Sequence, residues 1–348
     1  MTNTSETHRT NSNNHIEALV LSKEFMSITN TGDIDAAMMI LKQNEWKIEQ
    51  AISAYFDLKQ MNSHKSNDGQ NQTFPLDKRT VSTNNGLSNV KTQFKLLSWN
   101  IDGLDEDALE IRTRSIVDII KKEEPDAVFL QEVIPTSLQI IRKFLPEYKS
   151  YIGNNQGYFV VILIRQDLFI VHGFELIPYP GTMMNRNLLI VHTTYKNSIE
   201  IDFMTSHHES GTEAYASNQR MEQLKLCFKR MMDAPDHRIV LFGGDLNMRE
   251  RELREIGNIP SGICDLWIET GKQKECTYTW DMSVNTNNYF PNENNRPRAR
   301  FDRLYFRKSL KNDIKFQPIY FEVKGLEIIP SIQRYCSDHW AIQAYFNI

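Results

Sequence analysis

From residue 94 onward, the chain alternates short apolar runs with a few segments of helical periodicity. The runs are rich in β-branched and aromatic residues and end in polar residues or glycine, which is typical of buried β-strands. They lie at 94–99, 127–130, 158–164, 188–193, 199–205, 238–242, 301–306, 320–323 and 340–346. Helices are predicted at 111–122 and 214–232, where apolar residues share one helical face. Many strands with few helices predict an α/β fold of two packed sheets with helices outside.

The segment 15–58 has a different, purely helical periodicity. Apolar residues recur there at the i, i+3, i+4 spacing of one helix face, in three groups separated by polar residues. The groups are Ile16, Leu19 and Val20, then Ala37, Ile40 and Leu41, then Ile48, Ala51, Ile52, Tyr55 and Phe56. Three short helices are therefore predicted. A bundle of this size is near the lower limit for independent folding, which favours a binding module over an enzyme.

The two patterned regions are flanked by polar segments. We expect residues 1–14 to form a disordered tail, and residues 59–93, crowded with Asn, Ser, Thr, Gln and Lys, to form a disordered linker. The predicted organisation is a tail, a small helical bundle at 15–58, the linker, and a large domain at 94–348.

Composition narrows the functional classes. No apolar run approaches the ~20 residues that span a bilayer, so a membrane protein is not expected. The first fifteen residues lack the apolar region of a secretory signal, and the four cysteines form no C-x-x-C pair, so we expect an intracellular protein without a zinc knuckle or disulfides. The net charge of -4 limits any nucleic-acid contact to a local patch.

One basic stripe could supply such a patch. It consists of Arg296, Arg298, Arg300, Arg303, Arg307 and Lys308. Alternate residues of a strand point the same way, so these side chains could face one phosphate backbone. A solvated strand face is the other interpretation of this charge pattern.

Ligands for a hard cation follow three of the apolar runs. Asn100 and Asp102 come after the first run, Glu132 after the second, and Asp245 and Asn247 after the run at 238–242. Each piece alone could be a turn, because Asn and Asp are common turn formers. Strands laid side by side would gather all these oxygens at one sheet edge, where Mg²⁺ could bind and offset the charge of a phosphoryl group.

Histidines complete the pattern. His207 follows the run at 199–205, and His339 follows Asp338 just before the last strand, while Asp302 lies in the strand at 301–306. A single histidine at a strand end is usually structural. A histidine held by a carboxylate, however, favours the imidazolium form beside a phosphate. Taken together in this order, the motifs predict a magnesium-dependent phosphodiesterase.

The motifs WNIDGLD, LQEV, TSHHES, GGDLN, RFDR and SDHW occur in this order within residues 94–348. The order resembles the endonuclease/exonuclease/phosphatase superfamily, which includes deoxyribonuclease I and abasic-site endonucleases. WNIDGLD, YTWD and SDHW are most similar to its branch of 5′-tyrosyl-DNA phosphodiesterases. The segment 15–58, with FMSIT after its first helix and Trp46 opening the third, resembles a ubiquitin-associated (UBA-like) domain.

The resemblance implies a four-layered α/β sandwich, two packed mixed sheets flanked by helices, preceded by a three-helix bundle. It implies a hydrolase that uses Mg²⁺, with Mn²⁺ as an alternative ion. Its substrate would be the phosphotyrosyl bond between a topoisomerase II tyrosine and a DNA 5′ end, which is cleaved to a 5′-phosphate in double-strand break repair. Such an enzyme is expected in the nucleus, with the cytoplasm as a second location. We expect a monomer that binds single-stranded DNA ends, and ubiquitin through its N-terminal domain.

Residue roles are implied motif by motif. The metal ligands would be Glu132, Asp102 and Asp338. The catalytic residues would be Asn100, Asp245, Asn247, His207, His339 and Asp302. Contacts to DNA would come from Tyr158, Arg186, Ser210, Arg249, Trp280 and Phe301, and contacts to ubiquitin from Phe25, Met26 and Ile28. Glu132 would bind Mg²⁺ directly, Asp245 would position the attacking water, and Asp302 would orient His339.

Chemistry supports such a substrate independently. Tyrosine leaves as a phenolate of pKa ~10, so the site needs no dedicated general acid. Trp280 and Phe301 could stack on bases, which contributes ~1 to 3 kcal/mol per base without sequence preference. Ordinary core packing is the other interpretation of these two aromatic residues.

The chain also departs from the family pattern. His208 stands where the family has Leu, Leu246 where it has Thr, and the loop 285–297 is rich in Asn. Substrate preference is therefore open: an abasic-site or RNA phosphodiester, an inositol phosphate or a sphingolipid would suit the same fold. A ubiquitin-binding scaffold with an inert enzyme domain is the alternative from another class.

Overall fold

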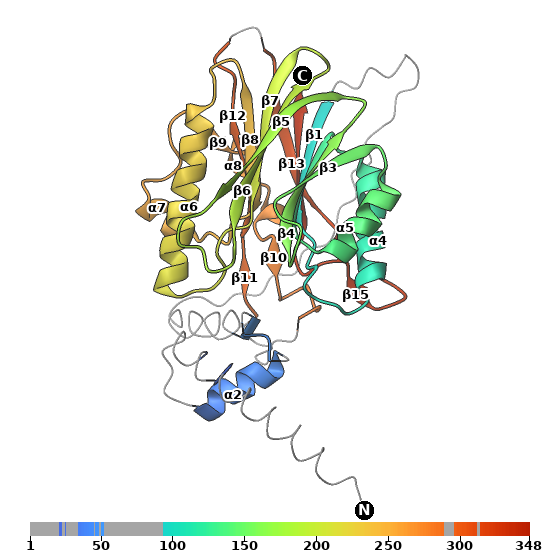
Figure 1. Ribbon diagram of the computed structural model, residues 1–348, viewed down its shortest axis with the longest axis vertical. Helices are drawn as coiled ribbons and strands as arrows, with labels where there is room; N and C mark the ends of the chain where they lie inside the picture. Colours follow the sequence, from blue (N-terminus) through green and yellow to red (C-terminus); the bar gives the residue numbers. More distant parts are fainter. Residues whose placement is uncertain are drawn as a thin grey trace, which may run out of the picture.

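The computed structural model describes residues 21–22, 25, 34–44, 46–48, 50–51, 93–288, 296–311 and 314–348. Within 93–348, two six-stranded sheets carry the fold (Figure 1). The first sheet has the order β13 (Gln317–Lys324), β16 (Ala341–Asn347), β1 (Gln93–Asn100), β2 (Ala127–Val133), β4 (Phe159–Arg165), β3 (Tyr148–Ile152). The second has the order β5 (Phe169–Pro178), β6 (Asn187–Tyr195), β7 (Ile199–Ser206), β8 (Ile239–Asp245), β12 (Asp302–Arg307), β9 (Ile263–Asp265).

Both sheets are mixed, and each has one parallel pair at its centre. β1 pairs in parallel with β2, and β7 with β8, while the other neighbouring strands are antiparallel. The carboxyl ends of a parallel pair lie at the same sheet edge. The strand ends that carry Asn100 and Glu132 are thus neighbours, as are those that precede His207 and carry Asp245.

The main core lies between the two sheets. It is built from inward-facing residues of both, and Phe94 at its centre contacts five other aromatic rings. These are Phe169, Tyr195, Phe203, Phe316 and Phe346. The central strands are buried almost continuously, because one face packs on the other sheet and the opposite face on helices, and this explains their uninterrupted apolar runs.

Helices cover the outer face of each sheet. α4 (Leu109–Glu123) and α5 (Pro135–Phe144) pack on the first sheet through residues such as Ile116 and Ile141. α6 (Ala214–Asp233) and α7 (Glu250–Glu255) pack on the second through residues such as Leu224 and Leu253. Figure 1 shows the two helix pairs on opposite sides of the sheets. This order of helix, sheet, sheet, helix confirms the predicted α/β sandwich.

Short elements complete the domain around the strand ends. They are α8 (Leu266–Glu269), a 3-10 helix η1 (Lys274–Cys276), the pair β10 (Trp280–Asp281) and β11 (Arg298–Ala299), and the pair β14 (Ile328–Ile329) and β15 (Arg334–Tyr335). Trp280 of β10 also forms a β-bridge with His339. The bridge ties the first strand of the β10–β11 hairpin to the last strand-end motif.

Near the N-terminus, the structure describes α2 (Ile34–Gln43) and isolated helical positions at 21–22, 25, 48 and 50–51. All lie in the segment for which three helices were predicted. Phe25, also predicted to contact ubiquitin, is fully buried in a small core, where its described neighbours include Ala37, Leu41 and Ala51, so its side chain is not exposed for such a contact. Met26 and Ile28, predicted to contact ubiquitin, lie outside the described residues, as do the predicted tail and most of the linker.

No described helix is both long and apolar enough to cross a membrane. The four cysteines are all free; Cys227, Cys276 and Cys336 are buried and Cys264 is half-buried.

Candidate active site

The carboxylate of Asp245, at the end of β8, lies at the centre of the site. Its Oδ2 accepts a hydrogen bond of 3.0 Å from Asn100 Nδ2, and His207 Nε2 lies 3.3 Å and His339 Nε2 3.7 Å away. The second amide hydrogen of Asn100 goes to Glu132 Oε1 at 2.9 Å. The structure therefore brings together five of the residues that the strand-end motifs singled out.

Close backbone packing makes this arrangement possible. Gly244, directly before Asp245, has φ of 140°, and a Cβ there would lie 2.1 Å from the main-chain oxygen of Ser206. Only glycine is tolerated at such a position. After Asp245, the main-chain N–H of Asn247 donates to Asp245 Oδ1 at 3.0 Å, which fixes the carboxylate plane.

Asp245 is held as a carboxylate. Burial alone would raise its pKa, but the interaction with His207, which includes a hydrogen bond, and the charge of His339 outweigh burial and hold the pKa of Asp245 well below its usual range. Asn100 adds a donated hydrogen bond that favours the charged form. The group is thus ionised at neutral pH and can orient a water molecule by accepting a hydrogen bond from it.

His207 is neutral, and its tautomer follows from its partner. Arg186 Nη1 lies 2.7 Å from His207 Nδ1, and a guanidinium can only donate. Nδ1 is therefore the acceptor, and the ring proton sits on Nε2, facing Asp245. Burial, reinforced by the charge of Arg186, lowers the pKa of His207 to about 4, although Asp245 opposes the shift.

His339, in contrast, is positively charged. Its Nδ1 lies 2.8 Å from Asp302 Oδ2, and burial would by itself lower the pKa of the ring. Asp302, followed by Asp338 and Asp245, outweighs burial and raises the pKa of His339 well above its ordinary value. The result is an imidazolium whose Nδ1–H donates to Asp302.

Three carboxylates, Glu132, Asp102 and Asp338, interact electrostatically beside this group. Burial first, and then the charge of Asp338, raises the pKa of Glu132 to about 7 and that of Asp102 well above its usual range, while the Asn100 hydrogen bond opposes the shift at Glu132. Among the described residues, Asp102 Oδ2 accepts no hydrogen bond. Crowded negative charge and a buried acceptor without a donor fit a hard divalent cation with oxygen ligands. Glu132 also lies with His207 and Asp245 so that one ligand atom of each is within 4.8 Å of the others.

The backbone at Glu132 shows how the chain aims this side chain. Glu132 has φ of 53°, and the pairing of β2 with β4 shifts register between Leu130 and Val133. A β-bulge of this kind turns a side chain away from the regular alternation of the strand. The sequence indicated the residue but gave no sign of the bulge.

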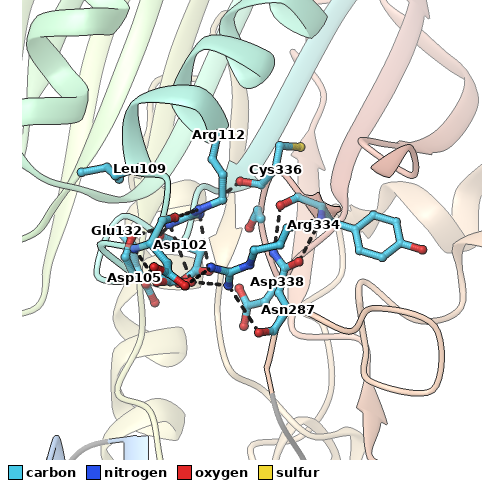
Figure 2. A network of polar contacts seen from close by, with 12 residues as sticks. Asp102, Asp105, Leu109, Arg112, Glu132, Asn287, Arg334, Cys336 and Asp338 are labelled. Carbon is cyan, nitrogen blue, oxygen red and sulfur yellow. Dashed lines mark hydrogen bonds and ion pairs between the residues drawn. The ribbon is translucent and has the colours of Figure 1, made fainter. Parts of the chain in front are cut away.

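A buried arginine that the sequence analysis missed supports the carboxylates. Arg112 of α4 is 1% exposed, and its Nη2 donates to the main-chain oxygen of Asp102 at 3.0 Å and its Nη1 to that of Cys336 at 3.2 Å (Figure 2). Its Nη1 also lies 3.6 Å from Asp102 Oδ2. The signal was present in the sequence, because Arg112 lies four residues before Ile116 and so belongs to the apolar stripe of the helix.

A second arginine, Arg334, connects β15 to the loop between β1 and α4, which carries Asp105 and Asp107. Arg334 of β15 pairs with Asp105 at 2.5 Å and Asp107 at 3.1 Å, and it donates to the main-chain oxygen of Asn287 at 3.3 Å (Figure 2). Asp338 accepts hydrogen bonds from Trp280 Nε1 at 3.1 Å and from an Asn288 amide at 3.0 Å. The carboxylate cluster, formed by Glu132, Asp102 and Asp338, is thereby connected to the segment 285–288.

The predicted DNA-contacting residues fall into two groups around the histidines. Beside His339, the rings of Trp280 and Phe301 are 5.6 Å apart, and the Arg249 guanidinium lies 5.1 Å from the centre of the Phe301 ring. Beside His207, the Arg186 guanidinium lies 4.7 Å from the centre of the Tyr158 ring. This second group lines a pocket with His207, while Ser210 donates to Met184 Sδ at 3.3 Å next to it.

The basic stripe proposed from the sequence is wrong for three of its members. Arg300 pairs with Asp265 and Glu250, and Arg303 is buried and also pairs with Glu250. Arg307 is buried and donates to main-chain oxygens, among them that of Pro235. Arg303 and Arg307 are used inside the protein because they belong to β12, an interior strand of its sheet, and Arg300 lies just before that strand.

The two departures from the family pattern are also buried. His208 lies against the rings of Tyr179 and Phe242, with centroid distances of 5.7 and 6.3 Å, and Leu246 is fully buried in the outer core. Burial lowers the pKa of His208 to about 3, so this ring is neutral.

Comparison with known proteins agrees with this geometry. Residues 97–339 match the Endonuclease/Exonuclease/phosphatase family, and residues 21–59 match the UBA-like domain family. The chain is 34% identical over 343 residues to tyrosyl-DNA phosphodiesterase 2 of Homo sapiens, a match that covers 94% of this chain and 92% of the human protein.

Solved structures give the same result. TDP2 of D. rerio, complexed with a single-strand DNA product, superposes with a TM-score of 0.70 at 37% identity and covers 74% of this chain and 100% of its own. TDP2 of C. elegans has a TM-score of 0.65 at 27% identity and covers 95% of this chain and 94% of its own. The family predicted from the strand-end motifs is confirmed. The chain therefore belongs to the endonuclease/exonuclease/phosphatase family and is a homologue of tyrosyl-DNA phosphodiesterase 2.

Proposed function

We propose that this protein is a Mg²⁺-dependent 5′-tyrosyl-DNA phosphodiesterase that releases tyrosine from a DNA 5′ end and leaves a 5′-phosphate. The observation that carries the proposal is the Asp245 carboxylate, held between a neutral His207 and the charged His339 next to Glu132. Near-full-length similarity to tyrosyl-DNA phosphodiesterase 2 supports the choice of substrate. The adduct would be a topoisomerase II tyrosine, which places the enzyme in double-strand break repair and in the nucleus.

In the proposed reaction, Asp245 orients the attacking water and accepts its proton. Asn100 and Asn247 keep the carboxylate in place through the hydrogen bonds described above. His207, protonated on Nε2, and the His339 imidazolium offer N–H donors to the phosphate oxygens, where negative charge grows in the transition state. Mg²⁺ held by Glu132, Asp102 and Asp338, or Mn²⁺ in its place, would offset further charge on the phosphate.

The leaving group explains why no further acid is required. A phenolate with a pKa of ~10 departs without protonation more readily than an alkoxide does. A site made of one base, two N–H donors and a cation is then sufficient.

For the DNA, we propose that Trp280 and Phe301 stack against bases near the 5′ end while Arg249 contacts the backbone. The contact of Arg249 with Phe301 supports this assignment. Arg186, Tyr158 and Ser210 lie around His207 and would contact the other side of the scissile phosphate.

For the N-terminal region, we propose a three-helix UBA-like bundle that binds ubiquitin, a role supported by the family match at 21–59. Phe25 lies in the small core and would shape the binding surface from beneath, with Met26 and Ile28 as the predicted contacts. A titration of labelled ubiquitin with the full chain tests this, and no chemical-shift change at up to millimolar protein would refute it.

The experiment for the activity uses one oligonucleotide with a 5′-phosphotyrosyl end and one with a 3′-phosphotyrosyl end, each with Mg²⁺ or EDTA. We expect release of a 5′-phosphate end only from the first substrate and only with Mg²⁺. Asp245→Ala and Glu132→Ala should both lose the reaction. Turnover of an abasic-site or RNA phosphodiester instead would assign another member of the same family.

A further inference from the structure

A chain of buried hydrogen bonds connects α6 to Arg186 by way of Glu209. Glu209 lies two residues after His207 and is 1% exposed. Its Oε1 accepts the main-chain N–H of Met183 at 2.8 Å. Its Oε2 accepts the Thr182 hydroxyl at 2.8 Å and the Gln223 side-chain amide of α6 at 3.1 Å.

Thr182 links Glu209 to the segment that carries Arg186 by hydrogen bonds on both sides of its hydroxyl. While its hydroxyl donates to Glu209, its oxygen accepts the main-chain N–H groups of Met184 at 3.2 Å and Arg186 at 3.1 Å. The segment 182–186 is therefore folded around one hydroxyl. Arg186 leaves this turn with its guanidinium on His207 Nδ1.

The chemistry of the Glu209 site requires a carboxylate. All three of its partners are donors, and the side-chain carboxylate forms no ion pair with any residue that the structure describes. Arg220, a buried cation of α6, donates to the main-chain oxygen of Glu209 instead. A glutamine amide would place an NH₂ group against a donor, so an almost isosteric change breaks the network.

We propose that Glu209 is a positioning residue, which together with Thr182 fixes the segment 182–186 and thereby holds the Arg186 guanidinium against His207. The proposal rests on the phosphodiesterase activity proposed above, because Arg186 belongs to that site. It assigns a role to the third residue of the HHES sequence, whose side-chain partners are Thr182, Met183 and Gln223.

The chain offers a matched control on the other side of Arg220, which donates to the main-chain oxygen of Glu209 and pairs with Glu252. Glu252 of α7 is 2% exposed, accepts the main-chain N–H of Arg249 at 2.8 Å, and pairs with Arg220 at 2.5 Å. It is a similarly buried carboxylate that holds the main chain at Arg249, not at Arg186. Glu252→Gln thus separates a general loss of packing from the specific contact of Glu209.

The first test is a double-mutant cycle on the 5′-phosphotyrosyl oligonucleotide. We expect Glu209→Gln and Thr182→Val to reduce kcat/KM roughly tenfold, while Thr182→Ser, which keeps the hydroxyl, stays near wild type. In an Arg186→Ala background, Glu209→Gln should cause less than about a twofold further loss. Glu252→Gln should cause the same fold loss in both backgrounds. A full, multiplicative effect of Glu209→Gln without Arg186 would overturn the proposal.

The second test does not depend on activity. Amide hydrogen exchange of the full-length protein should be faster at Met183 and Arg186 in Glu209→Gln than in wild type, and unchanged there in Glu252→Gln. Unchanged exchange in Glu209→Gln would also overturn the proposal. If wild type releases no tyrosine, the proposed function fails, and hydrogen exchange alone decides the role of Glu209.

Discussion

His207 and His339 face the same carboxylate, that of Asp245, but His207 is neutral and His339 is positively charged. Their Nε2 atoms lie 3.3 and 3.7 Å from Asp245 Oδ2. The difference comes from the far side of each ring, where His207 meets the Arg186 guanidinium and His339 meets the Asp302 carboxylate. One ring is kept neutral with a defined tautomer, and the other is kept charged. Together the two rings offer two N–H donors and one positive charge. Both can therefore donate to a phosphate without a second proton being taken up.

Asp245→Asn should lower kcat by about 10³-fold, within the 10² to 10⁴ range for loss of a general base. The amide keeps the shape of the side chain but cannot take the proton from water, and it also places an NH₂ group toward the Asn100 donor. Steady-state kinetics measures the effect, and thermal unfolding checks that the variant is folded. Retention of more than about a tenth of the activity would remove Asp245 from its assigned role.

Asp302→Asn should make activity more sensitive to alkaline pH. Because Asp302 is the main group that raises the pKa of His339, its neutralisation lets that pKa fall, and the imidazolium is lost at a lower pH. In a kcat/KM profile, the alkaline limb should move down by about one pH unit or more. An alkaline limb at the wild-type position would show that the charge on His339 is not needed.

Mg²⁺ should stabilise the fold more at pH about 8 than at about 5.5. The pKa of Glu132 is raised from 4.5 to about 7 in the folded protein, so between these values the folded state binds the extra proton. Without metal, the contribution of this group to stability therefore falls as pH rises through that window, and Mg²⁺ competes with the proton for the carboxylate.

Melting temperature with and without Mg²⁺ at the two pH values measures this effect. Glu132→Gln is the control, and its Mg²⁺-induced shift should be small at both. An equal shift for wild type at both pH values would contradict the assignment of Glu132 as a ligand.

His208→Leu should make the protein less sensitive to acid. The folded pKa of His208 is lowered to about 3 from 6.5, so its contribution is fully present above 6.5 and is lost as pH falls toward 3. Removing the ring should reduce the slope of unfolding free energy against pH by up to ~1.4 kcal/mol per pH unit in that range. His172→Gln, at an exposed position, is the control for removal of a histidine. Urea unfolding at several pH values decides, and an unchanged slope in His208→Leu would contradict its burial as a neutral ring.

Much of the site could be predicted from the sequence because its residues follow buried strands directly. Asn100, Glu132 and Asp245 each come at the end of an apolar run, and parallel neighbours bring such ends together. The pairing of Asp302 with His339 was also predictable, since both belong to motifs with a fixed order. The chemistry was therefore accessible before the geometry was known.

Other features were not predictable because they depend on burial of polar groups. Glu209 and Gln223 look like surface residues in the sequence, and only the packing of α6 on the second sheet places them inside.

β5 was missed because, at the edge of its sheet, it exposes apolar residues such as Phe174 and Leu176. A period of two is weak in such a strand, so the pattern of apolar positions gives little signal.

The most direct test of the account is hydrolysis of the 5′-phosphotyrosyl oligonucleotide in water enriched in oxygen-18, followed by mass spectrometry of both products. If a water positioned by Asp245 attacks phosphorus, one heavy oxygen enters the DNA 5′-phosphate for each turnover and the released tyrosine carries none. Label in the tyrosine hydroxyl, or no release of tyrosine by the Mg²⁺-loaded wild-type protein, would contradict the account.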